Sequence, residues 1–348
     1  MRQKPGILIV GNFLSHAGGS RGVCEDLAEQ LRAEGWQVIT TSSKPSRLPR
    51  LVDMVNTAWQ RRHEYDVAQV DVFSGPAFTW AEAVCWTLRR AKKPYVLTLR
   101  GGSLPQFSKR WPRRVKRLLR SATAVTTPSQ YLLEKMKPFR QDIRLIPNPL
   151  DLSKYPFRLR ERPNPRLVWL RAFHSIYNPT LASRVLAELV REFPQASLVM
   201  VGPDKGDGSF KETKRIVAEL GLEGRVSFPG GVPKKDVPTW LNKGDIFINT
   251  TNVDNTPVSV LEAMACGLCV VSTNVGGIPY LLDNGEDALL VSPDDAEGMA
   301  GAVRRILTDS ALARNLSQNA RRKAEQFDWS VVLPKWMSIL KEVAVSNV

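Results

Sequence analysis

The sequence predicts an α/β protein of two doubly wound domains, each built around a parallel sheet. Short apolar runs, many of them β-branched, alternate along the 348 residues with longer segments of helical period. This alternation is typical of strands that helices bury on both faces. A stretch with five prolines and many charges, at 146–166, interrupts both patterns and predicts a linker. The length suits two domains of roughly 150 residues.

Each half of the chain contributes six expected strands. The first six are 7–11, 38–41, 67–73, 95–99, 124–127 and 143–147, and the second six are 167–170, 197–202, 225–228, 245–250, 269–273 and 288–291. We expect Rossmann-like domains at 1–155 and 156–326, followed by a C-terminal segment at 327–348. Ligands of open α/β sheets bind at the carboxyl ends of the strands, so the active site is expected in a cleft between the domains.

Charge is distributed unevenly between the two halves. Residues 1–160 hold 28 Lys+Arg against 12 Asp+Glu, a net of +16, whereas residues 161–348 hold 21 against 22, a net of −1. No apolar run approaches the roughly 18 residues that span a bilayer. The opening "MRQKPGILIVGNFL" is too short in its apolar part for a signal sequence and is interpreted as the first strand of a cytoplasmic protein.

The four cysteines are expected to be buried structural thiols. Only "CGLC" at 266–269 has suggestive spacing, and a redox or metal pair is the alternative there. Cys266 ends an expected helix, Cys269 opens an apolar strand, and no second pair completes a zinc site. We therefore expect no metal site.

Two glycine-containing turns follow strands of the first domain. Gly18 and Gly19 precede an amphipathic helix, where backbone amides and the helix end favour an anion, although such glycines also occur for steric reasons alone. The strand at 95–99 ends in Arg100, Gly101 and Gly102. An arginine at this edge suits a phosphate or a sugar hydroxyl pair, and a surface arginine is the alternative.

The stretch "DNTPVSVLEAMACG", 254–267, is the most specific feature. A helix is predicted with Thr256 as its N-cap and Pro257 as its first residue. Glu262 lies on the apolar face that Val258 and Leu261 define, where a carboxylate costs free energy unless it accepts hydrogen bonds.

The order of groups along this stretch matches a nucleotide sugar. Asp254 precedes the helix end, the N-terminal amides follow it, and Glu262 lies roughly 7 Å along the helix axis. A nucleotide sugar presents sugar hydroxyls, a diphosphate and a ribose diol in the same order. The alternative is a loop aspartate and a solvated helical glutamate without a shared ligand.

Residues 254–291, "DNTPVSVLEAMACGLCVVSTNVGGIPYLLDNGEDALLV", resemble the E-x7-E signature of retaining glycosyltransferases of family four, which have the two-domain GT-B fold. The resemblance extends over nearly the whole chain. It includes "GGSRGVCEDLAEQLRAEGWQV", "VTTPSQYL", "IRLIPNPLDLSKY", "LGLEGRVSFPG" and the closing "FDWSVVLPKWMSIL", which is similar to a helix that crosses back to the N-terminal domain.

The resemblance implies roles for individual residues. Glu262 would bind the ribose, and Asp254 would contact the donor sugar. The donor-binding segment would comprise Asn255, Thr256, Pro257, Val258 and Ser259, with Gly18 and Gly19 approaching the phosphate from the other domain. No cofactor or metal is implied, because helix ends and basic side chains stabilise the leaving diphosphate.

Three positions depart from the family pattern. Its first acid is usually Glu and here is Asp254; its usual Arg and Lys pair keeps only Arg171, with Tyr177 and Asn178 in the lysine region. A histidine commonly stands where this chain has Arg100. We hypothesise that Arg100 or Lys205 supplies the missing positive charge.

The stretch "FSKRWPRRVKRLLRSA", 107–122, predicts one amphipathic helix with a basic face. Its cations include Lys109, Arg110, Arg113, Arg114, Lys116 and Arg117. This pattern suits an anionic membrane surface, and a solvated helix whose leucines face the core is the alternative. Nucleic acid is not expected, because no recognisable binding module is present and the second half adds no positive charge.

We therefore expect a glycosyltransferase that moves a sugar from a nucleoside diphosphate to an acceptor hydroxyl with retention. By resemblance, its N-terminal domain would bind a glycan or lipid-linked acceptor in polysaccharide, lipopolysaccharide or glycolipid assembly, peripherally on the cytoplasmic membrane face. The alternatives are a nucleotide-sugar epimerase or phosphorylase on the same fold, or a non-catalytic nucleotide-sugar or membrane-binding protein.

Overall fold

All twelve predicted strands are present in the computed structural model, which describes residues 4–15 and 22–345. They form two six-stranded sheets in which every pairing is parallel. The chain divides into two units, and Gly18 and Gly19 lie outside the described residues. Unit 1 comprises Met1–Pro149 with Ser330–Val348, and unit 2 comprises Leu150–Trp329.

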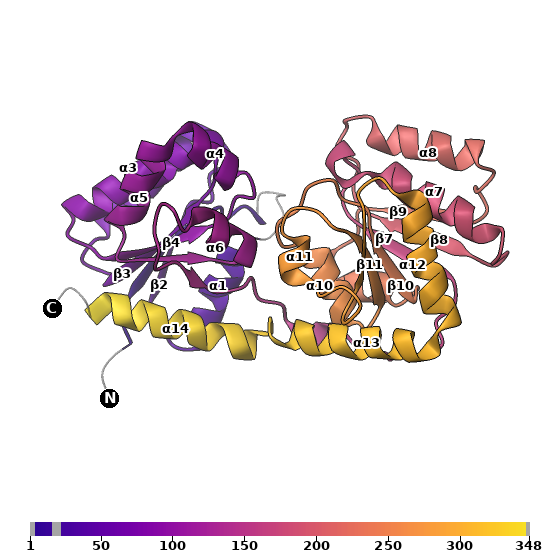
Figure 1. Ribbon diagram of the computed structural model, residues 1–348. Coiled ribbons are helices and arrows are strands. Elements are labelled where there is room, and N and C mark those ends of the chain that lie inside the picture. Colours follow the sequence, from indigo (N-terminus) through magenta and orange to yellow (C-terminus); the bar gives the residue numbers. More distant parts are fainter. Residues whose placement is uncertain (1–3, 16–21, 346–348) are drawn as a thin grey trace. The chain divides into compact units, whose positions relative to one another are not determined.

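Unit 1 has the strand order β2-β1-β3-β4-β5-β6. Strands β2, β3 and β4 of this sheet are labelled in Figure 1. Its strands are β1 (Ile7–Val10), β2 (Val38–Thr41), β3 (Val67–Val72), β4 (Tyr95–Leu99), β5 (Ala124–Thr127) and β6 (Arg144–Leu145). Its helices are α1 (Val23–Ala33), α2 (Arg47–Gln60), α3 (Phe78–Arg90), α4 (Leu104–Arg110), α5 (Pro112–Ser121), α6 (Gln130–Met136) and α14 (Trp329–Val345). From β1 the chain adds β2 on one side and then β3 on the other, so the order in which strands are added reverses between β1 and β3.

Unit 2 has the order β12-β11-β10-β7-β8-β9. Its strands are β7 (Arg166–Leu170), β8 (Ser197–Val201), β9 (Val226–Gly230), β10 (Ile246–Asn249), β11 (Cys269–Thr273) and β12 (Leu289–Val291). Its helices are α7 (Pro179–Val190), α8 (Ser209–Glu219), α9 (Val237–Leu241), α10 (Val258–Ala265), α11 (Ile278–Leu281), α12 (Ala296–Thr308) and α13 (Ser310–Glu325). In this sheet the order in which strands are added reverses between β7 and β10.

Alternate residues of the central strands in unit 2 face two separate hydrophobic clusters. Leu167 and Trp169 pack on one face of the sheet, and Val168 between them packs on the other. Side chains of successive strand residues point to opposite faces, so a strand covered on both faces needs apolar residues throughout. This burial explains why the strands are continuous apolar runs in the sequence.

The predicted basic helix is a pair of helices. α4 ends at Arg110, and α5 begins at Pro112. Trp111 between them has φ −129° and ψ 54°, outside the helical region. The single helix predicted over 107–122 was therefore wrong, because the residue before a proline is disfavoured in helical conformation.

Candidate functional site

The reversal between β7 and β10 places the predicted acids and arginine of unit 2 at one edge of its sheet. Arg171 directly follows β7, and the segment that contains Asp254 follows β10, which pairs with β7. The helices that leave two such strands diverge, and open α/β sheets bind their ligands in this crevice. Strand order alone thus gathers Arg171, Asp254 and the helix that carries Glu262.

Arg171 and Asp254 form a close ion pair. Nη2 of Arg171 contacts Oδ2 of Asp254, and the side chains are 15% and 12% exposed. The guanidinium carbon of Arg171 lies 4.7 Å from the ring centroid of Tyr177, in cation–π geometry. Burial lowers the pKa of Arg171 to about 10, so the group stays charged at neutral pH. Its Nε is buried without a hydrogen-bond partner.

Three glycines allow the backbone around this pair to pack closely. A Cβ atom on Gly202 would lie 1.6 Å from the carbonyl oxygen of Arg171. Cβ atoms on Gly276 and Gly277 would lie 2.2 and 2.0 Å from the carbonyl oxygens of Asp254 and Asn255. The amide of Gly277 donates to Asp254 O at 2.9 Å. No functional role was predicted for these glycines, although "VGP" at 201–203 and "VGG" at 275–277 each lie at or just after the end of a strand.

Helix α10 begins at Val258, with Pro257 as its N-cap. The sequence prediction of Thr256 as N-cap was therefore wrong by one position, since Pro257 has φ −69° and ψ 116° and lies outside the helix. Ser259 is 6% exposed, and its hydroxyl has no hydrogen-bond partner. The first amides of a helix also lack partners within the helix. The Ser259 hydroxyl and these amides are therefore hydrogen-bond donors without a partner in the helix, at the N-terminal end of α10, which carries partial positive charge.

Glu262 is 3% exposed, although it carries a carboxylate. The hydroxyl of Tyr155 donates a hydrogen bond to its Oε1, and Nζ of Lys234 lies 2.5 Å from the same oxygen. Tyr155 is buried, whereas the Lys234 side chain is 66% exposed. Glu262 also acts electrostatically on Arg171. Sequence reasoning missed Tyr155 and Lys234, because contacts across 107 and 28 residues leave no local signal.

Lys205 lies next to the segment that continues from Arg171. Its backbone amide donates to Phe173 O at 3.2 Å, and Phe173 forms a parallel bridge with Asp204. The residue is exposed. Its predicted role as the replacement cation stays a prediction.

Arg100 lies in unit 1, where its charge is balanced internally. Its Nε lies 2.9 Å from Oδ1 of Asp71, and the two side chains are 8% and 4% exposed. Nη1 donates to Oδ1 of Asn148 at 2.5 Å, while Nη2 is buried without a partner. A buried charge pair is costly to disrupt. Asp71 and Asn148 therefore hold the guanidinium of Arg100 within unit 1. Its predicted role toward the donor stays a prediction.

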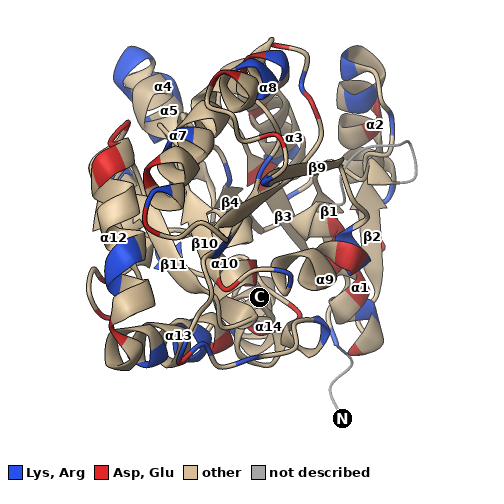
Figure 2. Cartoon of the chain, turned by 90° about the vertical axis from the view of Figure 1, so that its right-hand side faces the viewer, with Lys and Arg blue, Asp and Glu red and all other residues tan. Residues whose placement is uncertain are grey.

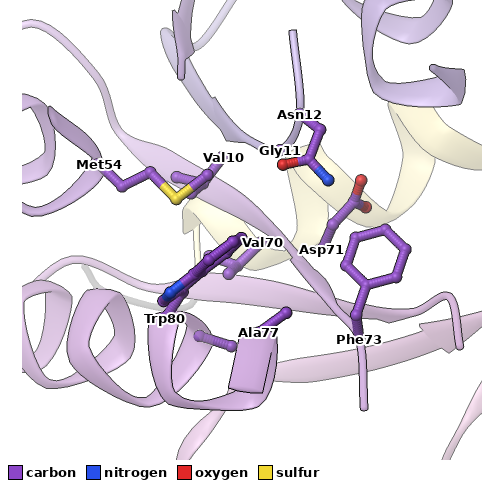
Figure 3. A pocket seen from close by; sticks show the side chains of 10 residues that line it. Val10, Gly11, Asn12, Met54, Val70, Asp71, Phe73, Ala77 and Trp80 are labelled. Carbon is purple, nitrogen blue, oxygen red and sulfur yellow. The ribbon is translucent and has the colours of Figure 1, made fainter. Parts of the chain in front are cut away.

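A small cavity lies at the reversal point of unit 1, at the carboxyl ends of β1 and β3 (Figure 3). Trp80 and Met54 form an apolar side, and Asp71 and Asn12 contribute polar atoms. Its volume of about 10 Å³ has room for about one water. The cavity is therefore too small to hold a sugar.

The basic residues predicted to contact a membrane lie on α4 and α5 (Figure 2). Lys109, Arg110, Arg113, Lys116 and Arg117 are exposed, whereas Arg114 is half-buried and pairs with Glu82 at 2.5 Å. The apolar residues of α5, Val115, Leu118 and Leu119, are buried in the core of unit 1. No helix in the described part of the chain is both long and apolar enough to cross a membrane.

The four cysteines are free and buried, as predicted. Burial raises the pKa of the Cys266 and Cys269 thiols to about 12. A thiol with such a pKa is a poor nucleophile and a poor metal ligand. Among residues 4–15 and 22–345, no three His, Cys, Asp or Glu side chains are placed to hold a metal ion.

Both halves of the chain match known protein families. Residues 157–323 match the family described as glycosyl transferases group 1, and residues 17–154 match glycosyltransferase family 4. The chain is 26% identical to an N-acetyl-alpha-D-glucosaminyl L-malate synthase of Bacillus anthracis, over 94% of each protein. It is 30% identical to a D-inositol 3-phosphate glycosyltransferase of Corynebacterium jeikeium, over 43% of this chain and 37% of that protein.

Solved structures share the architecture. The Anabaena protein HepE in complex with UDP and glucose has a TM-score of 0.78 at 21% identity, over 97% of this chain and all of the other. Sucrose-phosphate synthase from Thermosynechococcus elongatus has a TM-score of 0.78 at 19% identity, over 98% and 100%.

The two sheets, their strand orders and these solved structures show the GT-B fold, and the two family matches show that the protein is a glycosyltransferase. More narrowly, the chain belongs to glycosyltransferase family four, whose paired domains match both of its halves. The family and fold predicted from the sequence are confirmed.

Proposed function

We propose that this glycosyltransferase uses a nucleoside diphosphate sugar as its donor and retains the anomeric configuration. The observation that carries the proposal is the row of groups along α10. The Arg171–Asp254 pair precedes the helix, the unpartnered Ser259 hydroxyl lies in its first turn, and Glu262 lies farther along it. The structural relative HepE, whose structure holds UDP and glucose, supports this class of donor.

Each group has a distinct task in this proposal. The diphosphate takes Arg171 and the amide end of α10, which stabilise its charge as it leaves without a metal. Asp254 orients the sugar, and Glu262 accepts a hydrogen bond from the ribose. The departing phosphate oxygen accepts the proton of the acceptor hydroxyl, so no side chain acts as base.

Donor binding is tested by calorimetry with UDP, GDP and ADP on the wild-type protein and on Glu262→Gln. A hydrogen bond to a charged group contributes about 1.5–3 kcal/mol, so the variant should bind its nucleotide about 10- to 100-fold more weakly. Glu223→Gln, which changes an exposed acid of the same unit, serves as the control. Wild-type protein that binds none of the three nucleotides would contradict the proposal.

We propose that unit 1 binds the acceptor and places it at an anionic membrane, as suits a cell-envelope glycan or glycolipid. Trp80, which lines the small cavity at the carboxyl ends of β1 and β3, is partly exposed and offers an aromatic face that suits a polyol. Relatives support this setting: a phosphatidyl-myo-inositol mannosyltransferase of Mycolicibacterium smegmatis is 28% identical over 47% of this chain and 41% of its own length.

Exposed tryptophans strengthen the membrane proposal. Trp59, Trp86 and Trp111 are 45%, 54% and 43% exposed, on or beside helices α2, α3 and α5. Each stacks with an arginine, at 4.5 Å for Arg62 over Trp59 and 5.0 Å for Arg90 over Trp86. The three helices bury their inner faces in one cluster, so they cover the same face of the sheet. Tryptophan with a neighbouring cation suits the interface of a bilayer.

A further inference from the structure

The carboxylate of Glu262 is held at one oxygen only. Both the Tyr155 hydroxyl and the Lys234 ammonium contact Oε1. No side chain or amide of residues 4–15 and 22–345 donates a hydrogen bond to Oε2. The group therefore has one engaged oxygen and one that is available to a ligand.

The two contacts fix the orientation of the carboxylate. Tyr155 packs in the hydrophobic cluster that contains Val260 and Leu261 of α10, so its hydroxyl has little freedom to move. Lys234 approaches from the short helix at Lys234–Asp236 and balances the buried negative charge. A carboxylate with one oxygen anchored twice cannot rotate without losing charge-assisted hydrogen bonds.

Tyr155 remains a donor over the whole physiological range. Burial, and then the negative charge of Glu262, raise the pKa of its hydroxyl far above the ordinary value. A phenol that stays protonated keeps donating its proton to Oε1 of Glu262.

We propose that Tyr155 and Lys234 are positioning residues that direct Oε2 of Glu262 at the ribose hydroxyls of the donor. The inference rests on the nucleoside diphosphate donor proposed above. Because Oε1 is engaged by Tyr155 and Lys234, Oε2 is the oxygen left to accept from the ribose. Recognition of the sugar ring by this acid thus depends on how Tyr155 and Lys234 orient Oε2.

The test compares ribonucleotides with analogues that lack the hydroxyls. Dissociation constants are measured by calorimetry for UDP, GDP and ADP, each beside its 2′,3′-dideoxy analogue. We expect the wild-type protein to bind its preferred ribonucleotide at least about tenfold more tightly than the analogue. In Tyr155→Phe this ratio falls below about threefold, because ribonucleotide binding weakens while dideoxynucleotide binding does not change.

Two control variants remove the same groups elsewhere. Tyr65→Phe deletes a buried hydroxyl that donates to Ala58 O at 2.6 Å in unit 1, and it should keep the wild-type ratio. Lys234→Ala should lower the ratio as Tyr155→Phe does, whereas Lys235→Ala, at the exposed neighbouring residue, should not.

The outcomes separate this inference from the donor proposal. Equal weakening of both nucleotide types in Tyr155→Phe, or no weakening of either, would show a merely structural tyrosine and overturn the inference. A wild-type protein that binds nucleotides without regard to the hydroxyls would do the same while leaving the donor class intact. No nucleotide binding at all would overturn the proposed function and this inference with it.

Discussion

At the scale of single residues, the site contains two ion pairs, Arg171 with Asp254 and Lys234 with Glu262. Arg171 and Glu262 are both largely buried, and each has a partner of opposite charge. A buried charge without a partner costs several kcal/mol, so the pairs make the site compatible with a folded donor-free protein. In our proposal a bound donor replaces Asp254 as the partner of Arg171.

The glycines beneath Asp254 give a residue-scale prediction. Gly277→Ala places a Cβ atom 2.0 Å from Asn255 O, so the segment that holds Asp254 must shift. We expect a loss of about 1–3 kcal/mol in stability, as for other overpacked positions, and weaker donor binding. Denaturant unfolding and calorimetry measure the two effects.

Gly224→Ala is the matched control for this substitution. A Cβ atom at Gly224, in the same unit, meets no heavy atom within 4 Å. Equal stability and donor binding in the two variants would contradict the argument that close packing at Gly277 shapes the site.

At the scale of secondary structure, the strands were predictable and the partners of the acids were not. The predicted ranges 95–99, 124–127 and 269–273 agree with β4, β5 and β11 at both ends. Burial on both faces produces a strong local pattern, which explains this success. The apolar face of α10 likewise revealed Glu262, but only the fold brings Tyr155 and Lys234 to it.

The helical layer of unit 1 gives an element-scale prediction. Lys116→Glu with Arg117→Glu reverses two exposed charges of α5. Each cation near an anionic surface contributes about 1 kcal/mol, so the double variant should bind anionic vesicles at least about tenfold more weakly. Co-sedimentation with vesicles of phosphatidylglycerol and phosphatidylcholine measures the binding, which should also fall as salt rises.

Lys211→Glu with Lys214→Glu makes the same charge change on α8 of unit 2 and should retain binding. Equal losses in both double variants would indicate a response to net charge alone. Wild-type protein that stays in the supernatant at low salt would overturn the membrane proposal.

At the scale of the whole molecule, the two chain segments that connect the units are tied together within unit 2. The amide of Leu150 donates to Phe327 O at 2.7 Å, and the amide of Leu152 donates to Oδ2 of Asp328 at 3.1 Å. Along the chain, unit 1 passes into unit 2 between Pro149 and Leu150, within the proline-rich stretch at 146–166.

Helix α14 gives the prediction at this scale, since most of it belongs to unit 1. Trp336 is 2% exposed, and Trp336→Ala should destabilise unit 1 by about 3–5 kcal/mol. Hydrogen exchange should then accelerate in residues 4–15 and 22–149 but remain slow in 150–329. Lys335→Ala, at the exposed neighbour, should change neither. Faster exchange confined to 150–329 would contradict the division of the chain.

The late position of α14 in the chain also sets an order of synthesis. Unit 2 is a single continuous stretch, so all of its residues have left the ribosome before α14 emerges. Unit 1 begins first but lacks six buried side chains until unit 2 has been synthesised: Val332, Leu333, Trp336, Ile339, Leu340 and Val343. Domains usually fold in the order in which they are made. In this chain the domain that starts first is the one that finishes last.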